Sequence, residues 1–136
     1  MKEYLGPIDS LNSLTTVRWV SSRLQDEKVT IRNISAAEQI PVTSFLREIT
    51  LLEVRNLRTS VGSATITFSF GSGGSFGAIP GLSNLSLATS RANFTVSGQG
   101  QIITTAQEIR FDITTVTGGP LNILFLLIFC ETASLT

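Results

Sequence analysis

The residue types that most often carry catalysis are sparse in this 136-residue chain, which contains no histidine and only one cysteine, Cys130. Without histidine, neither a Ser-His-Asp nor a Cys-His arrangement can form, and one thiolate alone cannot hold zinc. Carboxylate pairs remain, at Asp26 and Glu27 and at Glu108 and Asp112. Because the first pair falls in a predicted turn and the second on the exposed face of a predicted strand, we expect solvated charges. The sequence therefore predicts a protein that is not an enzyme and has no metal site.

A glycine-rich stretch, residues 71–81, is the other candidate for chemistry, because backbone amides in such loops can hold phosphate groups. The stretch lacks the Gly-Lys-Ser/Thr ending of a P-loop, and Phe76 stands where the dinucleotide fingerprint has its third glycine. We therefore expect no cofactor. Residues 71–91 are predicted to form one long Gly- and Ser-rich loop that carries apolar side chains rather than charges.

The elements that would position these residues are predicted to be strands. Residues 109–113 alternate between apolar odd positions and charged even positions, which is typical of a half-buried strand. Residues 121–129 follow a Gly-Gly-Pro break and are apolar in both phases, which predicts the second strand of a hairpin, covered on both faces. Further strands are predicted at residues 17–20, 29–34, 64–70, 94–96 and 101–105.

One segment, residues 44–55, fits two kinds of element. Its apolar residues fall at helical spacing from Phe45 to Leu52, but Thr50, Leu52 and Val54 would also share one face of a strand, and we favour the strand. The fold prediction is a single all-β domain over residues 1–136, an antiparallel β-sandwich or jelly-roll-like domain of about seven or eight strands. Residues 1–12 could form an N-terminal arm.

Charged residues are unevenly distributed along the chain. Lys plus Arg and Asp plus Glu number ten each, with no run of like charge, so the basic surface of a nucleic-acid or membrane binder is missing. The first 58 residues hold about three quarters of the charge, whereas Arg91 is the only charged residue between Thr59 and Gln107. Because small monomers usually distribute charge over their surface, we expect a partner to cover this charge-poor stretch.

Apolar residues of the 71–91 loop are the predicted oligomer and partner contacts. A loop so rich in glycine is not expected to fold back rigidly without a partner, and depletion of charge is typical of interface cores. The competing interpretation is a mobile loop whose leucines pack on their own subunit. The predicted interface residues are Phe76, Ile79, Leu82, Leu85 and Leu87.

Targeting signals are not evident in the sequence. The first residues contain acids and a proline where a signal peptide has its apolar run. The longest apolar run, residues 121–129, is about half the length of a membrane-spanning helix. We expect a protein made in the cytoplasm, without a signal peptide or transmembrane segment.

A chain rich in serine and threonine, with sparse charge, a Gly/Ser/Phe-rich loop and an apolar last strand, resembles the small β-sandwich or jelly-roll structural proteins of bacteriophage virions. The resemblance covers most of residues 59–131. It implies a virion location and a homo-oligomer, in the first place a trimer, that can also bind a major capsid or other virion protein. Within this class it implies a capsid decoration (cement) protein first, and a tail or head fibre or receptor-binding protein second.

Two functions from other classes remain open at this stage. A carbohydrate-binding or adhesin module would present Trp19 or Tyr4 on an exposed groove, although a lone Trp lies more often in a core. An enzyme with a carboxylate pair would need two acids within about 5 to 10 Å of each other in a pocket.

Overall fold

The computed structural model describes residues 24–131, which form ten strands and no helix. The strands are β1 (Leu24–Ile34), β2 (Glu38–Ser44), β3 (Ile49–Thr59), β4 (Ser63–Ser72), β5 (Ser75–Ala78), β6 (Leu85–Leu87), β7 (Ala92–Thr95), β8 (Gln101–Ile103), β9 (Glu108–Thr117) and β10 (Leu121–Glu131). The prediction of an all-β antiparallel sandwich is confirmed. The strand predicted at residues 17–20 and the arm at residues 1–12 lie outside the described residues.

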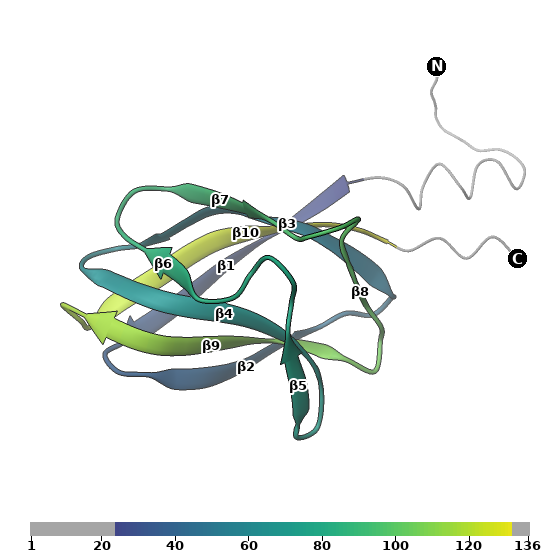
Figure 1. Ribbon diagram of the computed structural model, residues 1–136, viewed down its shortest axis with the longest axis horizontal. Coiled ribbons are helices and arrows are strands. Elements are labelled where there is room, and N and C mark those ends of the chain that lie inside the picture. Colours follow the sequence, from purple (N-terminus) through teal and green to yellow (C-terminus); the bar gives the residue numbers. More distant parts are fainter. Residues whose placement is uncertain (1–23, 132–136) are drawn as a thin grey trace, which may run out of the picture.

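Two five-stranded antiparallel sheets face each other across the core (Figure 1). The β10 sheet has the order β1-β10-β3-β7, and β8 also pairs with β3. The β9 sheet has the order β2-β9-β4-β5, and β6 also pairs with β4. Strands β9 and β10 are therefore both central, each in its own sheet.

The prediction of a hairpin between residues 109 and 129 is wrong, although both of its strands exist. β9 pairs with β2 and β4, whereas β10 pairs with β1 and β3. Residues 118–120 carry the chain from one sheet to the other, so β9 and β10 lie on opposite sides of the core. Both strands have an apolar inner face, and a sandwich buries two such faces against each other.

Full cover of β10 on both faces was also wrongly predicted. Its odd positions from Leu121 to Phe129 point into the core, but Leu124 and Leu126 on the outer face are only half-buried. A two-layer sandwich covers one face of each sheet, which leaves the other face of β10 beside solvent. Only Ile128 on that face is buried, at 8% exposure, and it lies outside the core cluster.

The ambiguous segment 44–55 is a turn followed by the start of β3, so the strand interpretation is confirmed. Its pairing with β10 shifts register twice, between Leu124 and Leu126 and between Ile128 and Phe129. Each shift places an extra residue in β3, so Leu51, Val54 and Leu57 all point inward at a spacing of three. The residues with helical spacing in the sequence, from Phe45 to Leu52, do not share one face, because Ile49 is buried whereas Leu46 is fully exposed.

Three phenylalanines from both sheets form the centre of the core. Phe68 on β4, Phe111 on β9 and Phe125 on β10 are each at most 2% exposed. Their ring centroids lie 5.1 to 5.3 Å apart in edge-to-face geometry, which adds to the energy of area burial. Phe125 belongs to the apolar run 121–129, and its burial places that run's strand in the core.

Candidate interaction surfaces

The five predicted interface residues do not lie together on the surface. Ile79 and Leu82 are fully buried, and Leu85 and Leu87 are 8% and 3% exposed, all within the core of their own chain. Only Phe76, on β5, is half-exposed. The reason for expecting a partner over the other four side chains therefore does not apply.

The segment that holds these residues closes one side of the sandwich, which we call the closed side. Its backbone is bonded to both sheets: the amide of Phe68 donates to the carbonyl of Leu82 at 3.0 Å, and the amide of Thr59 donates to Ala88 at 2.8 Å. Gly81 has φ +92°, and a Cβ there would lie 2.7 Å from the carbonyl oxygen of Thr95. Glycine thus permits the close approach that lets the chain fold back, contrary to the expectation that it would prevent this.

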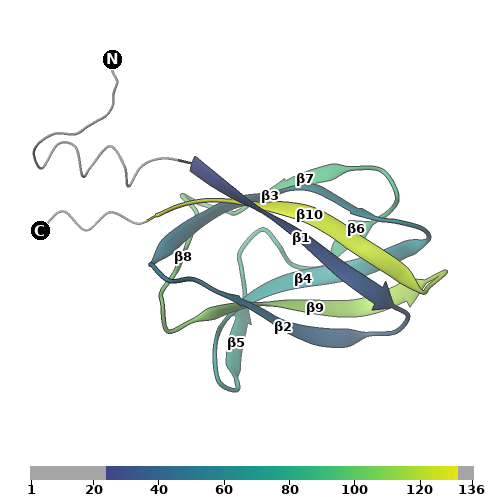
Figure 2. The same ribbon diagram turned by 180° about the vertical axis from the view of Figure 1, so that it is seen from behind.

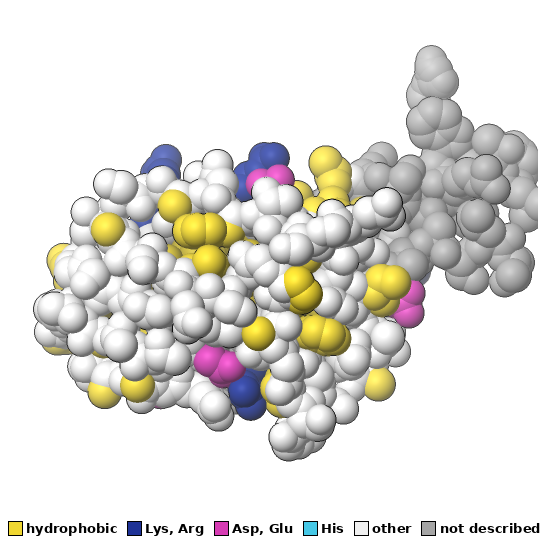
Figure 3. All heavy atoms as spheres, viewed as in Figure 1, with side chains coloured by type: hydrophobic (Ala, Val, Ile, Leu, Met, Phe, Trp, Pro, Cys, Tyr) yellow, Lys and Arg dark blue, Asp and Glu magenta, His cyan; other side chains and the backbone are white. Residues whose placement is uncertain are grey.

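The closed side is uncharged without being apolar. Figure 3 shows it as mostly white surface, with the few charged side chains near the upper and lower margins. Hydroxyl groups are used locally, as where the amide of Asn84 donates to Oγ1 of Thr67 at 2.9 Å. Serine and threonine hydroxyls and backbone polar groups, rather than charged side chains, make this surface hydrophilic.

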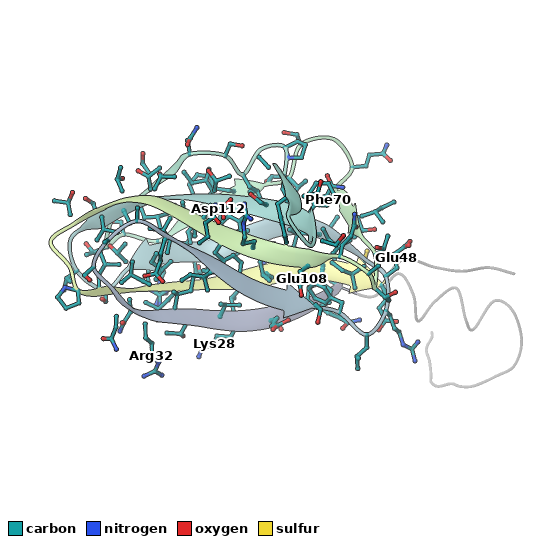
Figure 4. The ribbon with its side chains drawn as sticks, turned by 90° about the horizontal axis from the view of Figure 1, so that it is seen from below. Lys28, Arg32, Glu48, Phe70, Glu108 and Asp112 are labelled. Atoms are coloured by element: carbon teal, nitrogen blue, oxygen red, sulfur yellow. The ribbon has the colours of Figure 1, made fainter. Side chains whose placement is uncertain are left out.

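Of the predicted carboxylate pair on β9, Asp112 is held in an ion pair with Arg110 and does not face Glu108. Arg110 donates to both carboxylate oxygens of Asp112, at 2.7 and 3.1 Å, and Oγ of Ser69 donates to the same carboxylate at 2.7 Å. The guanidinium also lies 4.4 Å from the ring centroid of Phe76. Asp112 is half-buried, and both of its carboxylate oxygens accept hydrogen bonds. Glu108 lies at the start of the same strand (Figure 4). This arrangement links β9, through Arg110 and Asp112, to Ser69 on β4 and Phe76 on β5, three strands of the same sheet.

The other acidic pair, Asp26 and Glu27, lies within β1 and not in the predicted turn. Because neighbouring strand residues point to opposite faces, the two carboxylates diverge. Within residues 24–131 no group of three potential metal ligands comes together, and no helix has the length and apolar character to cross a membrane. Trp19 and Tyr4, required for the carbohydrate-binding reading, lie outside the described residues.

An exposed apolar region does exist, at one end of the β10 sheet. Leu24 and Ile102 are 62% and 49% exposed, and the pairing register places Cys130 and Thr50 in one row between them. Leu46, in the turn before β3, is 100% exposed. We call Leu24, Leu46, Ile102 and Cys130 the apolar end. Sequence reasoning missed it because Leu24, Leu46 and Ile102 lie in separate segments, and only the pairing of β1, β10, β3 and β8 places these segments at one end of the sheet.

The opposite side of the sandwich from the closed side stays open, and we call it the open side. Figure 2 shows β1 and β2 as its outermost strands, one in each sheet. Between them runs an open groove of about 580 Å³, with Ile31, Ile34 and Phe111 in its lining and Glu27 and Glu38 among its acidic residues. The backbone edge of β1 faces this groove.

No protein-family model matches the chain, and no curated protein matches it in sequence. Among solved structures, it is similar to the nucleoplasmin-like N-terminal domain of Drosophila FKBP39, with a TM-score of 0.44 and 5% identity over 83% of this chain and 94% of that chain. It is also similar to a chain of infectious bursal disease virus, Gx strain, with a TM-score of 0.39 and 10% identity over 82% of this chain and 33% of that chain. Such similarity concerns the general β architecture alone.

Proposed function

We propose that this protein is a non-enzymatic structural protein of a virion, and that it works by associating with itself and with a neighbouring shell protein. Capsid decoration is the first role in this class, and a fibre or receptor-binding role is the alternative. The apolar end is the observation that supports the proposal. It offers large apolar side chains on a rigid sheet edge, where a second protein surface can reach them.

The energetic argument rests on the exposed side chains themselves. Leu46 is fully exposed and Leu24 is 62% exposed, and scattered single cases would need no explanation. These two lie with Ile102 at the same end of one sheet, which is the pattern of a contact surface. Burying Leu46 fully would contribute about 1.5–3 kcal/mol from apolar area, and burying the exposed parts of Leu24 and Ile102 would contribute proportionally less. A protein surface that covers all three would therefore gain several kcal/mol before the costs of association.

The test is whether the full chain travels with large particles. Extracts of the cells that make it are fractionated on a density gradient, and the chain is expected in the particle fraction. The triple variant Leu24→Ser, Leu46→Ser and Ile102→Ser should move the chain from the particle fraction toward the fraction of free protein. Val61→Ser is the matched control, because Val61 is 49% exposed in the turn at the other end of β3. A wild-type chain found only as free 14.6 kDa monomer would contradict the proposal.

A further inference from the structure

β1 is the longest strand edge that the described sheets leave unpaired. It has 11 residues, ends the β10 sheet and pairs only with β10, in continuous register from Leu24 to Ile31 and with a register shift between Ile31 and Ile34. The other terminal strands of residues 24–131 are shorter: β5 and β7 have four residues, β6 and β8 have three, and β2 has seven and includes Pro41. An edge of this length is a ready template for another strand unless something blocks it.

The outer face of β1 carries charges of both signs. Asp26, Lys28 and Arg32 are all exposed, and among the described residues none of their side chains has a hydrogen bond or ion pair. Figure 4 shows Lys28 and Arg32 directed away from the body on the same side of the strand. Charges of one sign would repel a second copy of this edge, whereas a mixed row can be complementary to itself.

The order of these charges selects one pairing. Two copies of β1 related by a twofold axis perpendicular to the sheet run antiparallel, with residues of the same face opposite each other. With the axis at Val29, Asp26 lies opposite Arg32 of the second copy, twice, and Lys28 lies opposite Thr30. Moving the axis by one residue in either direction places Lys28 opposite itself or opposite Arg32. A register centred on Glu27 would place Asp26 opposite Lys28, but it also places Glu27 opposite itself on the other face. Among the registers centred on residues 27 to 30, only the one at Val29 therefore brings opposite charges together without a like pair.

We infer that β1 is a homodimerisation edge, at which two copies join around a twofold axis at Val29 into one continuous sheet. The inference rests on the proposed self-association and names the surface that carries one of its contacts. A twofold contact closes as a pair, so the trimer implied by the phage resemblance would need a second surface, for which the apolar end is available.

Charge reversal in the full chain tests the inference by sedimentation equilibrium at micromolar concentrations. Asp26→Arg or Arg32→Asp alone places two like pairs across the axis, and each should raise the dimer dissociation constant about tenfold or more. The double variant restores both pairs and should return to within about threefold of the wild type. Because the restored protein carries both substitutions, its recovery also shows that neither one prevents folding. Arg91→Glu, a charge reversal at an exposed residue just before β7, is the matched control and should leave dimerisation unchanged.

Three results would overturn the inference: a monomeric wild type, single variants that associate as the wild type does, or a double variant that stays dissociated. The proposed function fails differently. Single variants that no longer dimerise but still enter particles would support the β1 edge, and would locate the shell contact elsewhere. A chain that dimerises through β1 but never enters particles would support the dimerisation edge and contradict the virion role.

Discussion

The closed and open sides of this sandwich solve the same problem in opposite ways. Each is a place where two sheets end side by side and core residues would otherwise meet water. On the closed side the chain supplies its own cover, with Ile79 and Leu82 fully buried between hydrogen bonds to both sheets. On the open side only the short connection of residues 35–37, at one end, joins β1 and β2, and a groove of about 580 Å³ lies between the two strands.

The comparison shows that the charge-poor part of this molecule is not the part left open to a partner. The charge-poor stretch was expected to be the interface, yet it plugs the core and covers itself with hydroxyl groups. The charge-rich edge, with Asp26, Lys28 and Arg32, faces solvent and can be complementary to a copy of itself. Depletion of charge therefore marks a segment that will be buried, but does not say whether a partner or its own chain buries it.

The largest expected effect tests whether the closed side is true core. Leu82→Ala should lower the free energy of unfolding by about 2–5 kcal/mol through lost transfer energy and the remaining cavity. Phe125→Ala, at the centre of the sandwich, is the reference and should cost about 3–5 kcal/mol. Urea denaturation of both variants measures this. A Leu82→Ala protein as stable as the wild type would mean that residues 79–87 form a mobile loop after all.

A smaller effect isolates the glycine that lets the closed side form. Gly81→Ala combines φ +92° with a Cβ that would lie 2.7 Å from a backbone oxygen, so we expect a loss of about 2–4 kcal/mol. Gly73 has φ +59° but open space around its Cβ position, so Gly73→Ala should cost about 1 kcal/mol from conformation alone. Thermal unfolding of the two variants separates the packing cost from the dihedral cost. Equal losses would show that close packing at Gly81 is unimportant.

The smallest effect is expected on the open side. Arg32→Asp changes an exposed side chain without a partner among the described residues, so the unfolding free energy of the monomer should stay within about 0.5 kcal/mol of the wild type. The measurement needs dilute protein, because dimerisation would add its own stabilisation at higher concentration. A loss of several kcal/mol in dilute solution would place Arg32 in the fold rather than at an interface.

The sequence by itself determined the fold class and the inner faces of β4 and β9, but not the strands β5 and β6 inside the predicted 71–91 loop. Alternation in residues 109–113 and in 64–70 identified β9 and β4, and the apolar run from Leu121 identified β10. These readings succeed because the two-residue period of a strand is local, so burial of one face leaves a direct record in the order of residues. The absence of histidine likewise needed no structure to exclude whole classes of catalytic site.

Tertiary structure alone decided which strands lie side by side. β9 and β10 follow each other in the chain yet belong to different sheets, since alternation records which face is buried but not against what. Strand β3 lacks a strict two-residue alternation because its inward residues follow two register shifts against β10, a partner some seventy residues away. The apolar pattern from Ile79 to Leu87 fits either an interface with a partner or packing on the core of the same chain. Only long-range packing chooses between them, because both choices bury the same apolar area.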